Sequence, residues 1–203
     1  MGKVDVARNR FREIEACFER PAVAFKRLRT AYDSPERRYH SLVHILEMLD
    51  CLDRCSDIVC DRIAVTLAIW FHDVVYDVRN PPGRNEELSA ALLEQHARGP
   101  SVPAAAAMIR HSAHHGPSED VDTQLFCDLD LYRLGAPHEA FAGHSDDVRF
   151  EYGYLSDPEW AAGRAGFLKT VLMRRTIFQT RYWRGRLEHR ARENIAKAIE
   201  DIQ

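Results

Sequence analysis

The sequence predicts an all-α fold, and three observations lead to this prediction. The alternation of apolar and polar residues that marks half-buried strands is nearly absent from the 203 residues, and no Asn-Gly or Asp-Gly turn occurs. Apolar residues instead recur at helical spacing along most of the chain. The breaks between these stretches are too short for a flexible interdomain linker, so we expect one domain over residues 1–203.

The first half of the chain contains three apolar stretches. They are a stripe on Phe11, Ile14, Cys17 and Phe18, a stripe on Leu42, Ile45, Leu46, Leu49 and Leu52, and a nearly continuous apolar run over residues 63–75. Pro21 is expected to end the first stripe, because proline interrupts a helix. The third stretch is apolar on every side, as in a buried central helix.

The rest of the chain is expected to form six more helices. Their expected ranges are 85–98, 102–115, 121–133, 137–152, 158–178 and 182–202. Acidic residues begin the first of these ranges, and prolines stand near the start of three others, as is typical of helix N-termini. The sequence therefore predicts an all-α bundle of about eight to ten helices.

The composition excludes several classes of protein. Lys and Arg number 28 against 31 Asp and Glu, and this net charge of −3 gives no general attraction to nucleic acid. No apolar run is long enough to cross a membrane, and the first residues lack the apolar core of a signal peptide. The five cysteines are odd in number and lie among apolar residues. We therefore expect a cytoplasmic protein with reduced thiols that binds neither nucleic acid nor membranes.

Histidines and aspartates are concentrated in a few short segments. These segments contain His40 and His44; His72 and Asp73; His111, His114 and His115; and Asp128 and Asp130. Imidazole and carboxylate groups bind Zn²⁺, Mn²⁺ and Fe²⁺, and each segment lies on or near the end of an expected helix. Several helices could thus converge on one metal ion. A buried hydrogen bond between His72 and Asp73 without a metal is the alternative interpretation of that pair.

Four segments, in this order, resemble the HD superfamily of metal-dependent phosphohydrolases, and within it a subgroup of small predicted phosphohydrolases. They are Arg38-Tyr39-His40-Ser41-Leu42-Val43-His44-Ile45, Ala68-Ile69-Trp70-Phe71-His72-Asp73-Val74-Val75-Tyr76-Asp77, Asn85-Glu86-Glu87-Leu88-Ser89-Ala90 and Asp128-Leu129-Asp130-Leu131-Tyr132-Arg133-Leu134-Gly135. The family's pattern is a His, a His-Asp pair and a distant Asp on a helical bundle, and here His44 precedes His72 by 28 residues. The resemblance implies a single HD-type bundle with a divalent ion, Mn²⁺, Mg²⁺, Fe²⁺ or Zn²⁺. The implied ligands are His44, His72, Asp73 and Asp130.

Two ligand positions have competing candidates. His40 and His44 are one helical turn apart, so both can face one site. A similar segment in cyclic-nucleotide phosphodiesterases implies that His44 binds the metal and that His40 donates a proton, although Ser41 stands where those enzymes have Asn. Asp128 and Asp130 point about 200° apart on a helix, so both cannot face the metal. The resemblance favours Asp130, which leaves Asp128 as a cap or as a partner of a His ring.

A second metal ion would require His111 together with His114 or His115. We favour a single ion, in which case these residues line the pocket or end a helix. Asp77 lies one turn beyond Asp73 and is expected either to handle protons or to form a turn. The candidates for substrate binding are Arg38, Asn85, Glu86, Ser89, His114 and His115.

The loop over residues 78–84 directly follows the expected metal-binding helix and carries Arg79 and Arg84. We therefore expect it at the mouth of the site, beside an anionic ligand. Arg37, like Arg38, could bind a phosphate or be a solvated charge.

The resemblance implies a phosphohydrolase that cleaves a small phosphoester, such as a nucleotide, through a metal-activated water. His40 or Asp77 would transfer protons. The alternatives are a di-iron HD-type oxygenase and a non-catalytic, metal-containing nucleotide sensor. The expected partner is a small phosphorylated metabolite or nucleotide, and the sequence indicates no particular oligomeric state.

Overall fold

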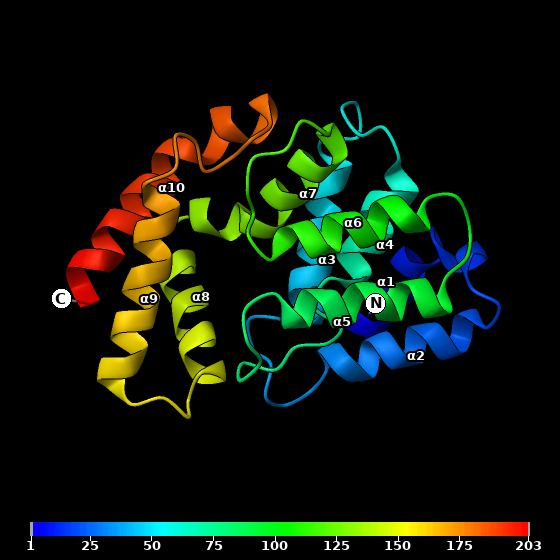
Figure 1. The fold of residues 1–203 in the computed structure, drawn as a ribbon, viewed down its shortest axis with the longest axis horizontal. Coiled ribbons are helices and arrows are strands. Elements are labelled where there is room, and N and C mark those ends of the chain that lie inside the picture. Colours follow the sequence, from blue (N-terminus) through cyan, green and yellow to red (C-terminus); the bar gives the residue numbers. More distant parts are fainter. Residues whose placement is uncertain (1, 203) are drawn as a thin grey trace. The chain divides into compact units, whose positions relative to one another are not determined.

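The computed structural model describes residues 2–202, which form ten α-helices and two short 3₁₀ helices (Figure 1). In chain order they are α1 Lys3–Phe11, η1 Glu15–Cys17, α2 Pro21–Tyr32, α3 Leu42–Asp53, α4 Arg62–Phe71, α5 Arg84–His96, α6 Val102–Ser112, α7 Val121–Leu131, η2 Tyr132–Gly135, α8 His138–Glu151, α9 Asp157–Leu172 and α10 Arg181–Ile202. No strand forms in this range, and Phe18 and Ala97 make an isolated antiparallel bridge. The predicted all-α class is confirmed.

The helices group into two compact units, one up to Phe126 and one from Cys127 onward. Helix α7 begins in the first unit and continues without interruption into the second. The organisation of residues 1–203 as one HD-type domain stays a prediction. No helix within residues 2–202 combines the length and the apolar character needed to cross a membrane.

Helix α4 forms the centre of the first unit. Every residue from Ala64 to Phe71 is buried, and α3, α5 and α6 pack against this helix. The Trp70 ring makes an edge contact with Phe11 at 5.7 Å between centroids, and Trp70 O accepts a hydrogen bond of 3.0 Å from the Tyr32 hydroxyl. Aromatic pairs of this kind add to the free energy gained by burying their surface.

The start of α4 is held by two carboxylates. Asp61 accepts a hydrogen bond from Ala64 N at 3.0 Å, which caps the helix. Asp122, which is buried on α7, accepts hydrogen bonds from Cys60 N at 2.8 Å and from Asp61 N at 2.7 Å. These bonds fix the position of the α4 N-terminus against α7 within the first unit.

The second unit is built on α10, which packs against α9 and η2 (Figure 1). Asn194 on α10 is buried, and its Nδ2 donates hydrogen bonds of 2.9 Å to both Leu134 O and Ala136 O. At Gly135 the two elements approach so closely that an added Cβ would lie 2.6 Å from the Leu187 Cβ. Only glycine fits at this position without displacing α10.

Six of the expected helices are confirmed with small differences at their ends, namely those at 85–98, 102–115, 121–133, 137–152 and 182–202 and the stripe on Leu42–Leu52. Helix α9 ends at Leu172 rather than near Phe178. All five cysteines are free thiols, as expected.

Two expectations in the first half are wrong. The stripe from Phe11 to Phe18 does not form one helix, because α1 ends at Phe11, a 3₁₀ turn follows, and Phe18 is extended. Pro21 begins helix α2, since proline at a first helical position lacks only an N–H that would be unpaired there.

Candidate metal centre

His72 stands at the C-terminal end of α4, not inside it, and the His-Asp pair lies in the turn that follows. Its main-chain N still donates to Ala68 O at 2.9 Å, and its Nδ1 lies 2.9 Å from Ile69 O. Because a carbonyl oxygen only accepts hydrogen bonds, Nδ1 carries a proton in this contact. The ring is thereby held in one orientation, and Nε2 is the nitrogen that can bind a metal.

The Asp73 carboxylate lies beside the Nε2 nitrogen of His72, with Oδ2 3.0 Å from it. Two lone pairs this close require a proton or a cation between them. The distance therefore fits both interpretations of the sequence, a His–Asp hydrogen bond and a pair of metal ligands.

His44 lies in the first turn of α3 and is fully buried. Its ring centroid is 5.6 Å from that of His72, with the two planes nearly perpendicular, and 5.5 Å from the Tyr39 ring. Two buried imidazoles in contact are suitable ligands for one metal ion, because neutral His is the commonest metal ligand in proteins.

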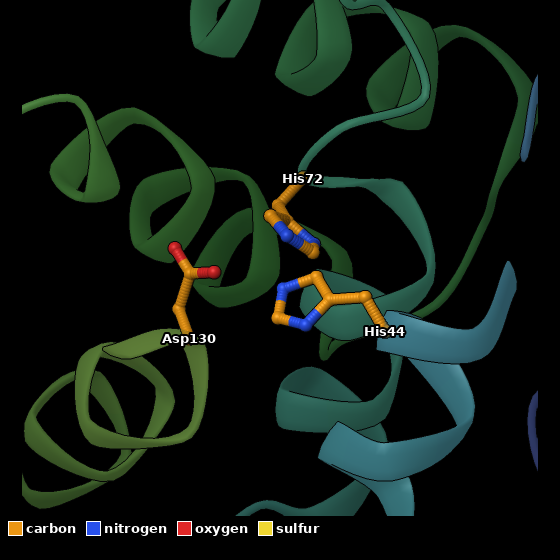
Figure 2. A group of neighbouring side chains, drawn as sticks. All are labelled: His44, His72 and Asp130. Atoms are coloured by element: carbon orange, nitrogen blue, oxygen red, sulfur yellow. The ribbon is translucent and has the colours of Figure 1, made fainter. Parts of the chain in front are cut away.

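Asp130 completes the group from α7. On this helix the Phe126 ring packs 5.8 Å from the His72 ring, and Asp130 follows one helical turn later on the same face. One candidate ligand atom from each of His44, His72 and Asp130 lies within 4.8 Å of those of the other two. Figure 2 shows the two rings and the carboxylate directed toward the same small space.

The donors fit a divalent metal ion. Donor atoms on one ion lie about 2.0–2.2 Å from it, so two of them are at most about 4.4 Å apart. The group's 4.8 Å limit is close enough to this value for small side-chain rotations to close it. Two imidazoles and a carboxylate form a mixed N/O set that suits Zn²⁺, Mn²⁺ or Fe²⁺. Asp73 is outside this group of three, and its role as a fourth ligand stays a prediction.

Asp128 and Asp130 point to different partners, as their spacing predicts. The buried Asp128 carboxylate accepts hydrogen bonds from Gln179 N at 2.6 Å, Thr180 N at 2.8 Å and Thr180 Oγ1 at 2.6 Å, just before α10 begins. Burial raises the pKa of Asp128 to about 6, although these three bonds favour the carboxylate form. Asp128 therefore holds the segment that leads into α10, and the first turn of that helix is capped by Thr180, whose Oγ1 accepts from Trp183 N at 3.3 Å.

Arg37 has a structural role that the sequence does not indicate. Its guanidinium donates to Asp73 O at 2.6 Å and to Val74 O at 3.3 Å. It also lies over the rings of Tyr32 and Tyr76, at 5.6 and 5.5 Å. These contacts fix the main chain of the turn that carries His72 and Asp73. Both acceptors are main-chain carbonyls 36 and 37 residues away, so no residue pattern could have revealed them.

The predicted proton-transfer and substrate residues border the segment after His72. The His40 ring stacks on Tyr76 with centroids 4.0 Å apart. Asp77 Oδ1 accepts from Arg79 N at 2.9 Å, which is the turn-forming role. The Asn85 side chain binds the main chain of Asp77. Its Oδ1 accepts from Asp77 N and its Nδ2 donates to Asp77 O, each at 3.1 Å.

Ser89 is buried, and its hydroxyl accepts from Val75 N at 3.1 Å and donates to Val75 O at 3.3 Å. Arg38 and His114 are exposed, whereas Glu86 and His115 are half-buried. The binding of a substrate by any of these residues stays a prediction.

The third histidine segment does not join the group. His111 Nε2 lies 2.9 Å from Gly116 O, so this nitrogen donates to a carbonyl. Within residues 2–202 no second set of three clustered His, Cys, Asp or Glu ligands forms. The structure thus brings together three of the four predicted ligands, and of the two candidates His40 and His44 it is His44 that belongs to this group.

Comparison of the chain with protein-family models, with curated proteins and with solved structures gives no match. The resemblance to the HD superfamily therefore depends on the motifs alone. What the described residues establish is an all-helical chain with two buried imidazoles and a half-buried carboxylate that could hold a metal ion.

Proposed function

We propose that the chain is a metal-dependent phosphohydrolase of the HD type that cleaves small phosphoesters such as nucleotides. The observation that carries the proposal is the grouping of His44, His72 and Asp130, which are separated by 28 and 58 residues in the sequence. These are three of the four positions that the motif implies. A group of side chains that came together by chance would rarely coincide with the positions of this motif.

The donor set supports hydrolysis rather than a purely structural ion. Structural zinc sites use four protein ligands and favour thiolates, whereas the three grouped residues leave one position open on a four-coordinate ion. If Asp73 joins them, positions for water and substrate remain on a six-coordinate ion such as Mn²⁺. A divalent ion held there by His44, His72 and Asp130 would polarise a phosphoryl oxygen and make a coordinated water more acidic.

The chain's own groups would position the reactants. The Ile69 carbonyl orients the His72 ring, and Arg37 fixes the turn that places Asp73. His40, stacked on Tyr76, is the proposed proton donor to the leaving group. Arg79 and Arg84 carry positive charge on the segment that follows this turn, which favours an anionic substrate.

The di-iron alternative has less support. It requires His111 together with His114 or His115 as ligands, and none of these three belongs to the group of clustered ligands among the described residues.

Metal analysis of chelator-free protein is the first test. His72→Ala and Asp130→Ala should lose the bound metal, whereas the exposed His189→Ala should keep it. Equal metal content in all four proteins would refute the ligand set.

The second test is turnover. Phosphomonoesters and cyclic nucleotides are screened with Mn²⁺, Mg²⁺, Fe²⁺, Co²⁺ and Zn²⁺ in turn, with Asp130→Ala as the blank. Hydrolysis that Asp130→Ala lacks supports the enzyme. Tight nucleotide binding without turnover under any metal would instead support the sensor and overturn the proposed activity.

A further inference from the structure

The first unit contains a pocket that none of the predicted metal ligands lines. Its volume is about 280 Å³, and its walls come from the junction of η1 and α2, the end of α4 and the end of α5. This volume is slightly below the range of about 300–1,000 Å³ found for small-molecule sites.

One side of the pocket is strongly basic. Arg20, Arg27 and Arg98 line it, against the single carboxylate of Glu19. Three guanidinium groups always carry charge, so the lining has an excess of positive charge in a concave space, which concentrates the field on an anion.

One of these three cations, Arg98, is also held in place before any ligand arrives. Arg98 Nη1 donates to Glu94 O, Gln95 O and Ala97 O at the end of α5, over 2.8–3.3 Å. Its main-chain N donates to Cys17 O at 2.7 Å. These bonds fix the position of one cation, and a fixed cation loses little conformational entropy when it binds.

His96 faces the same cations. Its Nε2 contacts the Arg27 guanidinium, which can only donate, so the His96 ring accepts this bond as a neutral imidazole. Burial lowers the pKa of His96, and Arg27 and Arg98 lower it further. Glu19 is the acidic group on this lining, and Arg20 adds a further positive charge.

The other side of the pocket is apolar. Phe18 and Phe71 stack with ring centroids 5.8 Å apart and planes 11° from parallel. Val23, half exposed, and Leu28 extend this surface. A fully hydrated ion would gain nothing from these walls, whereas an apolar group would be removed from water by them.

We propose that this pocket binds a small organic anion whose oxyanion, a carboxylate or a phosphate monoester, faces Arg20 and Arg27 while its apolar body covers Phe18 and Val23. This inference does not depend on the metal centre or on the proposed hydrolysis. It assigns the chain a second ligand site.

The test uses chelator-treated full-length protein, so that binding at a metal ion does not contribute. Calorimetric titrations with phenyl phosphate and with benzoate compare the two oxyanions, and inorganic phosphate and phenol test each half of the ligand alone. At least one aromatic anion should bind more tightly than both halves. It should also shift the NMR signals of the His96 ring, which are assigned from a His96→Gln variant.

Arg27→Gln should weaken the binding of that anion about tenfold or more, because it removes a charged hydrogen-bond donor. Lys26→Gln is the matched control, since Lys26 is the next residue on α2, is exposed, and does not line the pocket. Both positions are exposed, so both variants should keep the wild-type helical content by circular dichroism. Equal affinity in the two variants, an unshifted His96 signal, or phenol binding as tightly as the anions would overturn the inference.

Discussion

Arg37 acts on the site through two main-chain carbonyls, and its contribution can be measured. Arg37→Gln should lower the affinity for Zn²⁺ or Mn²⁺ about 10- to 100-fold, the usual cost of removing a group that supports metal ligands. The reason is that the turn bearing His72 and Asp73 loses its anchor. Calorimetric metal titration measures the change.

The neighbouring Arg38 is exposed and provides the control, because Arg38→Gln removes the same charge one residue away. Arg37→Lys should recover only part of the affinity, since an ammonium group lacks the planar fork that reaches both carbonyls. If Arg37→Gln and Arg38→Gln bind metal equally, the anchoring role is wrong.

The sequence predicts the candidate metal ligands better than it predicts the residues that hold those ligands in position. The choice of Asp130 over Asp128 follows from helical geometry and the motif, and the hydrogen bonds from Thr180 and Gln179 to Asp128 agree with it. The Arg37 contacts were not predictable, because a carbonyl acceptor leaves no trace in residue type.

Among the elements, the η2–α10 contact depends on a single glycine. Gly135→Ala should lower the free energy of unfolding by about 1–3 kcal/mol, because the new Cβ would lie 2.6 Å from the Leu187 Cβ and the helix would have to move. Chemical denaturation measures this loss.

Gly163 in the middle of α9 is the matched position, because a Cβ added there meets nothing within 4 Å. Gly163→Ala should raise the free energy of unfolding by about 0.5–1 kcal/mol through helix propensity. The same sign for both variants would contradict the packing argument.

Asp53 joins three helices, since Arg10 on α1 and Arg62 on α4 both donate to it at the end of α3. Partial burial raises the pKa of Asp53, but the bonds and charges of the two arginines outweigh burial, so its pKa lies below the usual 3.8. The carboxylate therefore stabilises the fold at pH values above about 4, and this contribution is lost as the pH falls through the lowered pKa.

Asp53→Asn should accordingly reduce stability at pH 7 by about 1 kcal/mol or less, because the Asp53 side chain is 43% exposed. The difference from wild type should shrink on acidification below pH 4. Urea denaturation at several pH values measures it, with exposed Asp50→Asn as the control on the same helix. A difference that grows toward low pH would contradict the assigned sign.

Most helices were predictable because each buries one apolar face, and this face leaves a periodic pattern in the sequence. The missed helix α2 and the misjudged end of α4 have local causes. A proline such as Pro21 can end one helix or begin another, and the sequence does not distinguish the two. In the structure Phe18 is extended, so the first helical segment has already ended and Pro21 begins α2. The apolar run continues past Phe71 because the turn after α4 is itself packed, so composition does not mark the helix end.

For the molecule as a whole, metal binding should appear as added stability. An ion that binds the folded chain and not the unfolded chain adds about 2.7 kcal/mol at a concentration 100 times its dissociation constant. The melting temperature should therefore rise when Mn²⁺ or Zn²⁺ is added to chelator-treated protein, as measured by scanning calorimetry.

The same addition should leave the melting temperature of Asp130→Ala nearly unchanged. His189→Ala, whose histidine is exposed on α10, should respond as the wild type does. An equal rise in Asp130→Ala would show that the ion binds elsewhere.

Helix α4 is restrained at both ends, by the Asp122 carboxylate at its start and by Tyr32 and Arg37 around its last turn. A rod fixed in this way cannot slide along its axis, so His72 cannot advance or retreat to suit ions of different radius. Only side-chain torsions remain for that adjustment. The centre should therefore discriminate among ions by radius as well as by their affinity for nitrogen donors, with Mn²⁺ binding more weakly than Zn²⁺ in competition titrations.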